Sequence, residues 1–186
     1  QAVELPATAP LPQARPSPLA DEAALTAFAP FASRKLPFGE VAPLKTGLSL
    51  LSAGDIAAVR ALCDELPPGS LERRIMAWAI ALSGAQAVRS RQIAQTMEML
   101  SGWPGLERLM ANRERALYHE HAPAREVLAV FKDALPVTFE GKMALARALM
   151  ETGDEEAARA IIAPVWRKEK LEARQESALL AAFGPL

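Results

Sequence analysis

Two histidines flank one glutamate at His119, Glu120 and His121, and the chain contains no other histidine. Imidazole and carboxylate groups are metal ligands, so this cluster is the first candidate for chemistry. Residues at positions i and i+2 of a helix point about 200° apart, whereas the i, i+4 spacing of HExxH places two imidazoles on one face. We therefore interpret the cluster as a solvated helix end and predict no metal site.

The other chemically distinctive side chains are one cysteine and three tryptophans. Cys63 has no partner for an internal disulfide, and its apolar neighbours predict a small buried side chain. Trp78, Trp103 and Trp166 lie in helical patterns, which favours packing over a ligand platform. The sequence contains no glycine-rich phosphate loop, GxSxG elbow, CxxC pair or carboxylate cluster. It therefore predicts no catalytic residue and no cofactor.

The balance of charge excludes two classes of partner. The 21 basic and 22 acidic side chains nearly cancel and form no long run of one sign, so no field gathers phosphate backbones. Charged residues such as Arg60 and Asp64 interrupt every apolar stretch before it reaches the roughly 18 residues of a membrane span. We predict a soluble protein with no nucleic-acid partner and no membrane span.

Proline content divides the chain at about residue 40. Eight of the 15 prolines lie in the first 43 residues, where each ring removes a backbone donor and opposes a continuing helix. Residues 1–40 are predicted to form an extended arm or linker, with one short helical turn at about 19–28. Residues 41–186 are predicted to form a single helical-repeat domain.

Apolar residues recur at spacings of three and four from residue 41 onward, interrupted by Gly, Pro or a capping residue. We expect Ser70 and Thr138 to act as helix N-caps, and no segment has the alternation of a strand. The pattern predicts helices at about 41–51, 54–66, 71–83, 86–100, 105–120, 123–135, 139–151, 154–168 and 171–183.

An internal repeat connects two of these helix pairs. The segment LLSAGDIAAVRAL at 50–62 matches LMETGDEEAARAI at 149–161. Their separation equals three periods of about 33 residues, a length typical of tetratricopeptide-like hairpins. A weaker copy lies one period before the second, with Glu120 in place of the glycine. This period predicts a tetratricopeptide-like α-solenoid, a right-handed superhelical stack of about four antiparallel helical hairpins. A plain helical bundle is the alternative.

Three stretches together resemble a known family. They are MAWAIALSG at 76–84, MLSGWPGLERLMANRERAL at 99–117 and LPVTFEGKMALARALMETGDEEAARAIIAPVWR at 135–167. Their order and spacing resemble the N-terminal superhelical domain of periplasmic soluble lytic transglycosylases, over about residues 41–184. In that family a separate C-terminal lysozyme-like domain cleaves peptidoglycan, with a Glu followed by Ser as its general acid and base.

Glu176 and Ser177 imitate this catalytic pair, but the glycine-rich GLMQ segment that follows it in the family is missing before Leu186. We interpret Glu176 as a carboxylate on a helix face and transfer no catalytic residue to this chain. The last residues, AAFGPL, offer no polar capping helix of the kind that ends a solenoid. A truncated array, part of a longer enzyme, is therefore expected.

The resemblance implies a noncatalytic scaffold in the periplasm, inactive alone, that shapes the enzyme. Its implied partners are peptidoglycan glycan strands, the missing catalytic domain and other cell-wall proteins. The alternative is a stand-alone tetratricopeptide-like adaptor that binds a protein or peptide in its concave groove.

Overall fold

The computed structural model describes residues 41–168 and 170–184, and all of its helices belong to one compact unit, Gly39–Leu186. The described residues form nine α-helices and no strand, which confirms the predicted all-α class. The predicted arm at 1–40, with its helical turn at 19–28, lies outside the described residues. The helices are α2 (Val41–Ser52), α3 (Ile56–Glu65), α4 (Leu71–Ser83), α5 (Ser90–Met99), α6 (Leu106–His119), α7 (Ala124–Val130), α8 (Phe139–Glu151), α9 (Glu155–Lys168) and α10 (Ala173–Phe183).

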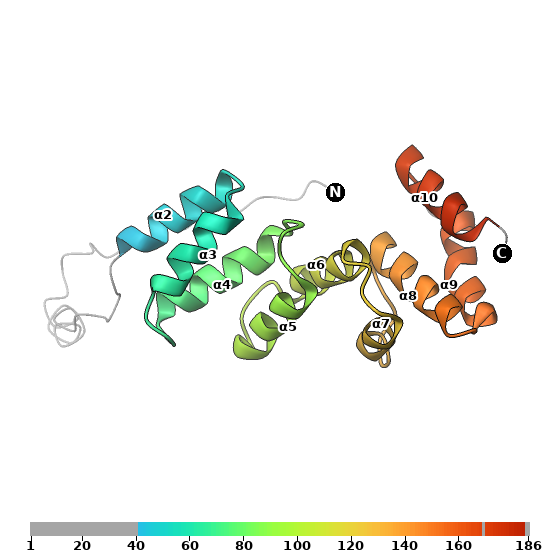
Figure 1. Cartoon of the computed structure of the whole chain (residues 1–186), viewed down its shortest axis with the longest axis horizontal. Helices are drawn as coiled ribbons and strands as arrows, with labels where there is room; N and C mark the ends of the chain where they lie inside the picture. Colours follow the sequence, from blue (N-terminus) through green and yellow to red (C-terminus); the bar gives the residue numbers. More distant parts are fainter. Residues whose placement is uncertain (1–40, 169, 185–186) are drawn as a thin grey trace, which may run out of the picture. The chain divides into compact units, whose positions relative to one another are not determined.

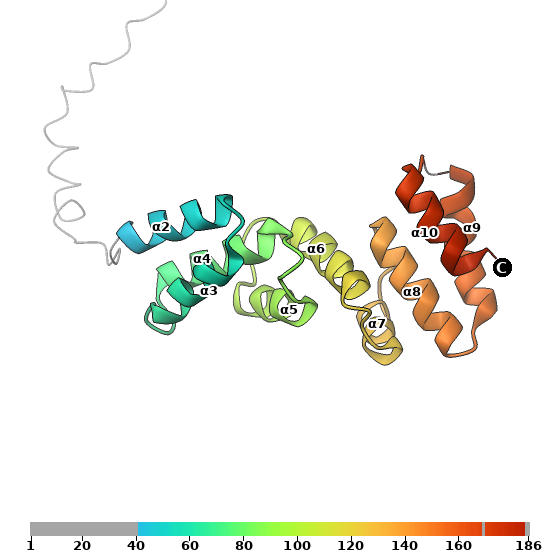
Figure 2. The same ribbon diagram turned by 45° about the horizontal axis from the view of Figure 1, so that its top comes forward.

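The contacts between helices α2 to α9 arrange them in two rows, and Figures 1 and 2 show the succession of these helices along the unit. In the first row α2 contacts α4, α4 contacts α6, and α6 contacts α8. In the second row α3 packs on α2 and α4, α5 packs on α4 and α6, and both α7 and α9 pack on α8. Helices α4, α6, α8 and α10 start at Leu71, Leu106, Phe139 and Ala173, a spacing close to the period expected from the sequence repeat.

Four turns that lead from the first row to the second contain one residue with a left-handed backbone. Such a residue ends a helix by returning backbone N–H groups to its last carbonyls, and glycine adopts this conformation without steric cost. The residues are Gly54 (φ +80°), Gly84 (φ +68°), His121 (φ +51°) and Gly153 (φ +84°).

The two Gly-Asp copies of the repeat have the same turn geometry. The N–H of Asp55 donates to the carbonyl of Leu50 at 3.0 Å, and the N–H of Asp154 donates to that of Leu149 at 2.9 Å. In the weaker copy the left-handed residue is His121 and not Glu120. Our alignment of that copy was therefore wrong by one residue, because only the backbone conformation identifies the turn when glycine is absent.

Ser70 and Thr138 cap helices as predicted, since their hydroxyls accept from the N–H of Arg73 and Gly141. Two predicted boundaries were wrong. Helix α5 begins at Ser90 and not at 86, because a hydrogen-bonded turn from Ala85 buries Val88 ahead of it.

Helix α7 ends at Val130, although the sequence pattern extended it to 135. Pro136 restricts only Leu135 to extended conformations, so the earlier end of the helix has another cause. Residues 131–137 turn the chain back toward α6. There the carboxylate of Glu114 accepts from the N–H groups of Val137 and Thr138.

Apolar side chains from both rows meet in three buried clusters. One joins α3, α4, α5 and α6 around Val59, Met76 and Ile93. The other two lie on either side of α8, where Ala144 and Ala148 pack toward α7 and Ala146 packs toward α9 and α10. Alanine lets the neighbouring helices approach α8 closely on both sides.

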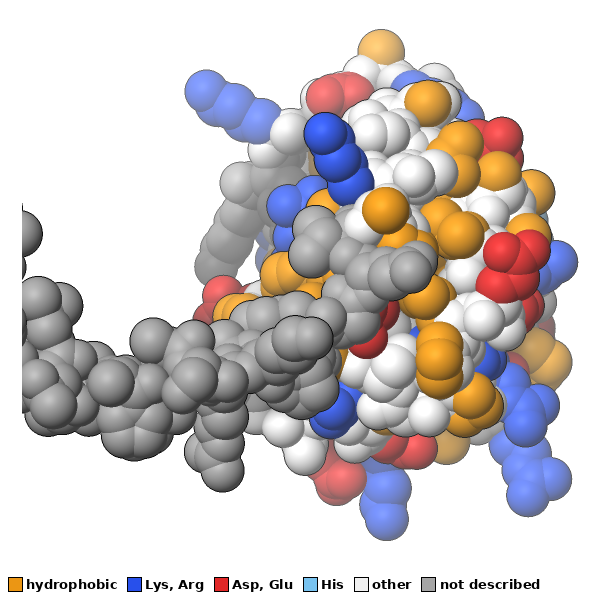
Figure 3. All heavy atoms as spheres, turned by 90° about the vertical axis from the view of Figure 1, so that its left-hand side faces the viewer, with side chains coloured by type: hydrophobic (Ala, Val, Ile, Leu, Met, Phe, Trp, Pro, Cys, Tyr) orange, Lys and Arg blue, Asp and Glu red, His pale blue; other side chains and the backbone are white. Residues whose placement is uncertain are grey.

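The surface at the α2 end of the unit mixes acidic, basic and apolar side chains (Figure 3). Among the described residues, no helix combines the length and apolar character needed to cross a bilayer.

Candidate ligand-binding groove

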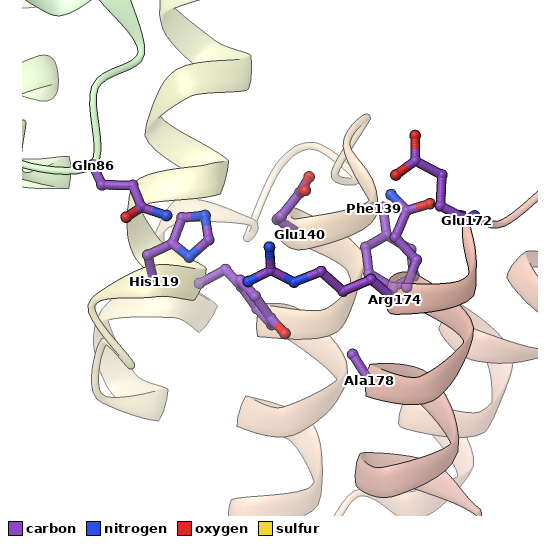
Figure 4. Close-up of a pocket in the computed structure, with 9 residues that line it drawn as sticks. Gln86, His119, Phe139, Glu140, Glu172, Arg174 and Ala178 are labelled. Carbon is purple, nitrogen blue, oxygen red and sulfur yellow. Dashed lines mark hydrogen bonds between the residues drawn. The ribbon is translucent and has the colours of Figure 1, made fainter. Parts of the chain in front are cut away.

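A cavity of about 350 Å³ lies beside α8, between α6 and the first turns of α10. In Figure 4, Arg174 extends from α10 toward α6, and His119 and Gln86 face it from the opposite wall. Glu140 lies between the two walls, at the start of α8. The lining residues are Gln86, Tyr118, His119, Phe139, Glu140, Glu172, Arg174, Gln175 and Ala178.

A second cavity of about 260 Å³ continues along α8. Tyr118 and Ala178 line both cavities, so the two are neighbours. We call them together the α8 groove. The second part is more apolar, with Met143, Met150 and Phe183 in its wall.

The carboxylates of the groove already have structural partners. Glu140 forms a long ion pair of 3.9 Å with Arg115, and Glu172 forms a reciprocal capping box with Gln175 at the start of α10. Arg147 pairs with Glu151 at 3.5 Å. Of these contacts only the capping box is a pair of hydrogen bonds, and the ion pair of Glu140 is too long to be one.

Arg174 differs from the other charged groups of the groove. Its side chain is exposed, and it makes no ion pair or hydrogen bond with the rest of the chain that the structure describes. Its guanidinium donors therefore face solvent, in the same cavity lining as the amides of Gln86 and Gln175.

Helix α6 positions the groove through three polar side chains that the sequence pattern did not reveal. Asn112 donates to the carbonyls of Ala81 and Leu82 at the end of α4, at 3.0 and 3.1 Å. Glu120 accepts from the N–H and hydroxyl of Ser90, at 2.6 and 2.9 Å. Each contact satisfies an end of a neighbouring helix and so fixes that helix against α6.

Glu114, the third of these side chains, ties α6 to the start of α8. Its buried carboxylate accepts from the N–H of Val137 at 3.1 Å, the N–H of Thr138 at 2.7 Å and the hydroxyl of Thr138 at 2.6 Å. A Cβ atom at Gly141 would lie 2.5 Å from Oε2 of Glu114, so glycine is required for this approach. The signal available in the sequence was an acidic residue three and four positions away from the apolar Ala111, Met110, Leu117 and Tyr118 on one helix face.

The two histidines and the glutamate at 119–121 have different roles in the structure. His119 and His121 are exposed at the end of α6, and both line the α8 groove. The interpretation as a solvated helix end was wrong for Glu120, whose carboxylate caps α5. Within the described residues, no three His, Cys, Asp or Glu side chains are grouped to hold a metal ion.

Cys63 is buried as predicted, and burial raises the pKa of its thiol. The nearby Arg73 lowers the pKa and Asp64 raises it further, but both effects are smaller than that of burial.

Trp78 and Trp103 pack edge to face at 5.9 Å, and the indole N–H of Trp78 donates to the carbonyl of Pro104. Trp166 is 41% exposed on α9, so its burial is only partial. Glu176 lies exposed on α10, as predicted, and does not line the α8 groove.

The chain was compared with protein-family models, curated proteins and solved structures, and none matched it. Support for a function therefore comes from the groove itself and from the sequence resemblance.

Proposed function

We propose that this chain is the noncatalytic scaffold of a periplasmic, peptidoglycan-cleaving soluble lytic transglycosylase, and that its α8 groove guides glycan strands. The proposal includes a right-handed superhelical, tetratricopeptide-like stack. It is supported by the three resembling sequence stretches, by the regular spacing of the repeat and by an open groove along the first row of helices.

The groove carries the observation on which the proposal rests. Glycan strands present apolar ring faces together with hydroxyl and acetamido groups. Tyr118 and Phe139 can pack against a ring face, while Gln86, Gln175 and Arg174 can exchange hydrogen bonds around it. Because the groove is open, a polymer can pass through it without threading an end.

Noncatalytic character is proposed for a chemical reason. A single catalytic acid must give and take a proton, which requires an ionisable group free to contact the substrate. Glu172 is engaged in the capping box of α10, and Glu140 faces Arg115 at 3.9 Å. We therefore assign cleavage to the separate domain that the resemblance implies.

One observation favours a second candidate, a stand-alone adaptor for a protein helix or peptide. The part of the groove beside Met143, Met150 and Phe183 is apolar and flanked by Arg147 and Glu151. Met150 is half-buried and offers a flexible methionine side chain, and an apolar groove beside it suits an amphipathic peptide.

Sedimentation with purified sacculi tests the leading proposal. We expect the chain to sediment with sacculi and Arg174→Ala to sediment less, while Arg159→Ala, an equal charge loss at an exposed position of α9, behaves like the original chain. No release of anhydro muropeptides is expected. A chain that stays in the supernatant, or that releases such products, would overturn the proposal.

A further inference from the structure

A separate cleft of about 620 Å³ lies between α4 and α5, beside the turn that follows α3. None of its lining residues is acidic, and two are arginines. The polar residues around it are Arg73, Arg74, Gln92, Gln95 and Thr96. We call this site the arginine cleft.

The two arginines of the cleft differ in how their side chains are bonded. The guanidinium of Arg73 donates to the carbonyl of Leu66 at 3.0 Å and pairs with Asp64 at 3.3 Å. The side chain of Arg74 makes no ion pair or hydrogen bond within the described part of the chain, and its Nε is buried without a partner. The desolvation of this N–H is not compensated by a hydrogen bond, which is also the case for Nε of Arg113 on α6.

The opposite wall supplies further donors. The side-chain oxygen of Gln92 accepts from Arg60 at 2.7 Å, and this contact leaves the NH₂ group of Gln92 available to donate. Gln95 is exposed beside it on α5. None of the residues that line the cleft is acidic, and the acid beside it, Asp64, is paired with Arg73. Guanidinium and amide donors in such a lining suit a planar anion, and arginine binds carboxylates through two parallel hydrogen bonds.

From this arrangement we propose that the arginine cleft binds the free carboxylates of peptidoglycan stem peptides, with Arg74 as the principal contact. This inference depends on the proposed function, because that function brings the chain to a polymer whose short peptides carry several carboxylates. A cleft of this volume can hold a ligand of a few residues. The α8 groove would then contact the glycan and the arginine cleft its peptide.

Isothermal titration of the full chain with the tripeptide L-Ala-D-Glu-meso-diaminopimelate tests the inference. We expect saturable binding, with about 10- to 100-fold loss of affinity in Arg74→Gln, since hydrogen bonds to charged groups contribute about 1.5 to 3 kcal/mol. Arg91→Gln, at an exposed position of α5 outside the cleft, should leave the affinity unchanged.

The tripeptide with all its carboxylates amidated gives a test that needs no variant. It should bind as weakly as the free tripeptide binds to Arg74→Gln. If the tripeptide does not bind, or if amidation or Arg74→Gln leaves binding unchanged, the inference is overturned. The sacculus experiment is read separately, so sacculi that retain the chain without tripeptide binding would defeat this inference and leave the proposed function standing.

Discussion

At the scale of single residues, Glu114 is the clearest example of a side chain that positions the α8 groove without lining either of its cavities. Its carboxylate accepts from two backbone N–H groups and one hydroxyl at the start of α8. In Glu114→Gln, one of the two acceptor oxygens is replaced by an NH₂ group that cannot accept from these donors. We expect the free energy of unfolding to fall by about 2 to 3 kcal/mol, measured by urea denaturation.

Glu107→Gln is the matched control, because Glu107 is exposed on the same helix. It should change stability by less than about 0.5 kcal/mol. Equal effects of the two substitutions would show that the Glu114 contacts do not hold α6 against α8.

Cys63 provides a second prediction at this scale. Because burial raises the pKa of its thiol, the native chain should be alkylated by iodoacetamide far more slowly at pH 8 than the urea-unfolded chain. The native pKa lies above the unfolded value, so the contribution of Cys63 to stability is present at neutral pH. It should decrease as pH rises through the ordinary thiol range. Equal alkylation rates in the native and unfolded chains would contradict this account.

The sequence revealed local polar contacts better than distant ones. Ser70 and Thr138 could be predicted as caps because each accepts from an N–H three residues later. Asn112 and Glu114 bond to groups in other hairpins, and the sequence period does not specify which side chains meet across hairpins. Glu120 was misinterpreted for the same reason.

At the scale of elements, the turn between α6 and α7 is the strained member of its set. His121 has the left-handed backbone that glycine adopts at the three related turns. A side chain in this conformation costs about 1 kcal/mol. We expect His121→Gly to raise the free energy of unfolding by about 0.5 to 1 kcal/mol.

Gly153→Ala is the reciprocal test. A Cβ there meets no atom within 4 Å, so only its φ of +84° opposes a side chain. Thermal unfolding should show a loss of about 1 kcal/mol. If His121→Gly destabilises the chain, the imidazole has a role that outweighs backbone strain.

Gly141 tests how tightly α8 approaches α6. Alanine normally stabilises a helix interior by about 1 kcal/mol relative to glycine. At Gly141, a Cβ would lie 2.5 Å from Oε2 of Glu114 and 2.9 Å from Cβ of Pro136. We therefore expect Gly141→Ala to destabilise the chain in denaturant unfolding, and less so in a Glu114→Ala background. A stabilising Gly141→Ala would refute the close approach.

The sequence predicted the bounds of a helix correctly where the residues that begin and end it are its own neighbours in the chain. The bounds of α4 and α8 match the predicted 71–83 and 139–151, because a cap begins each helix and a turn residue ends it. The start of α5 and the end of α7 were wrong because tertiary contacts to Glu120 and Glu114 define them.

At the scale of the whole described unit, the repeat was predictable and the groove was not. The Gly-Asp copies indicated a regular succession of hairpins, and the four left-handed turns follow that plan. The α8 groove combines residues from α6, α8 and α10, which belong to successive repeats. No single motif contains these residues, so only the packing of successive helices brings them together.

An NMR titration of the ¹⁵N-labelled chain with a soluble, peptide-free glycan tetrasaccharide tests the central claim most directly. We predict saturable shift changes centred on the amides of Gln86, Tyr118, His119, Phe139 and Arg174. Residues on α3 and on the outer surface of α9 should not shift. No change at saturating glycan, or changes confined to those distant helices, would contradict the assignment of the α8 groove as a glycan-binding surface.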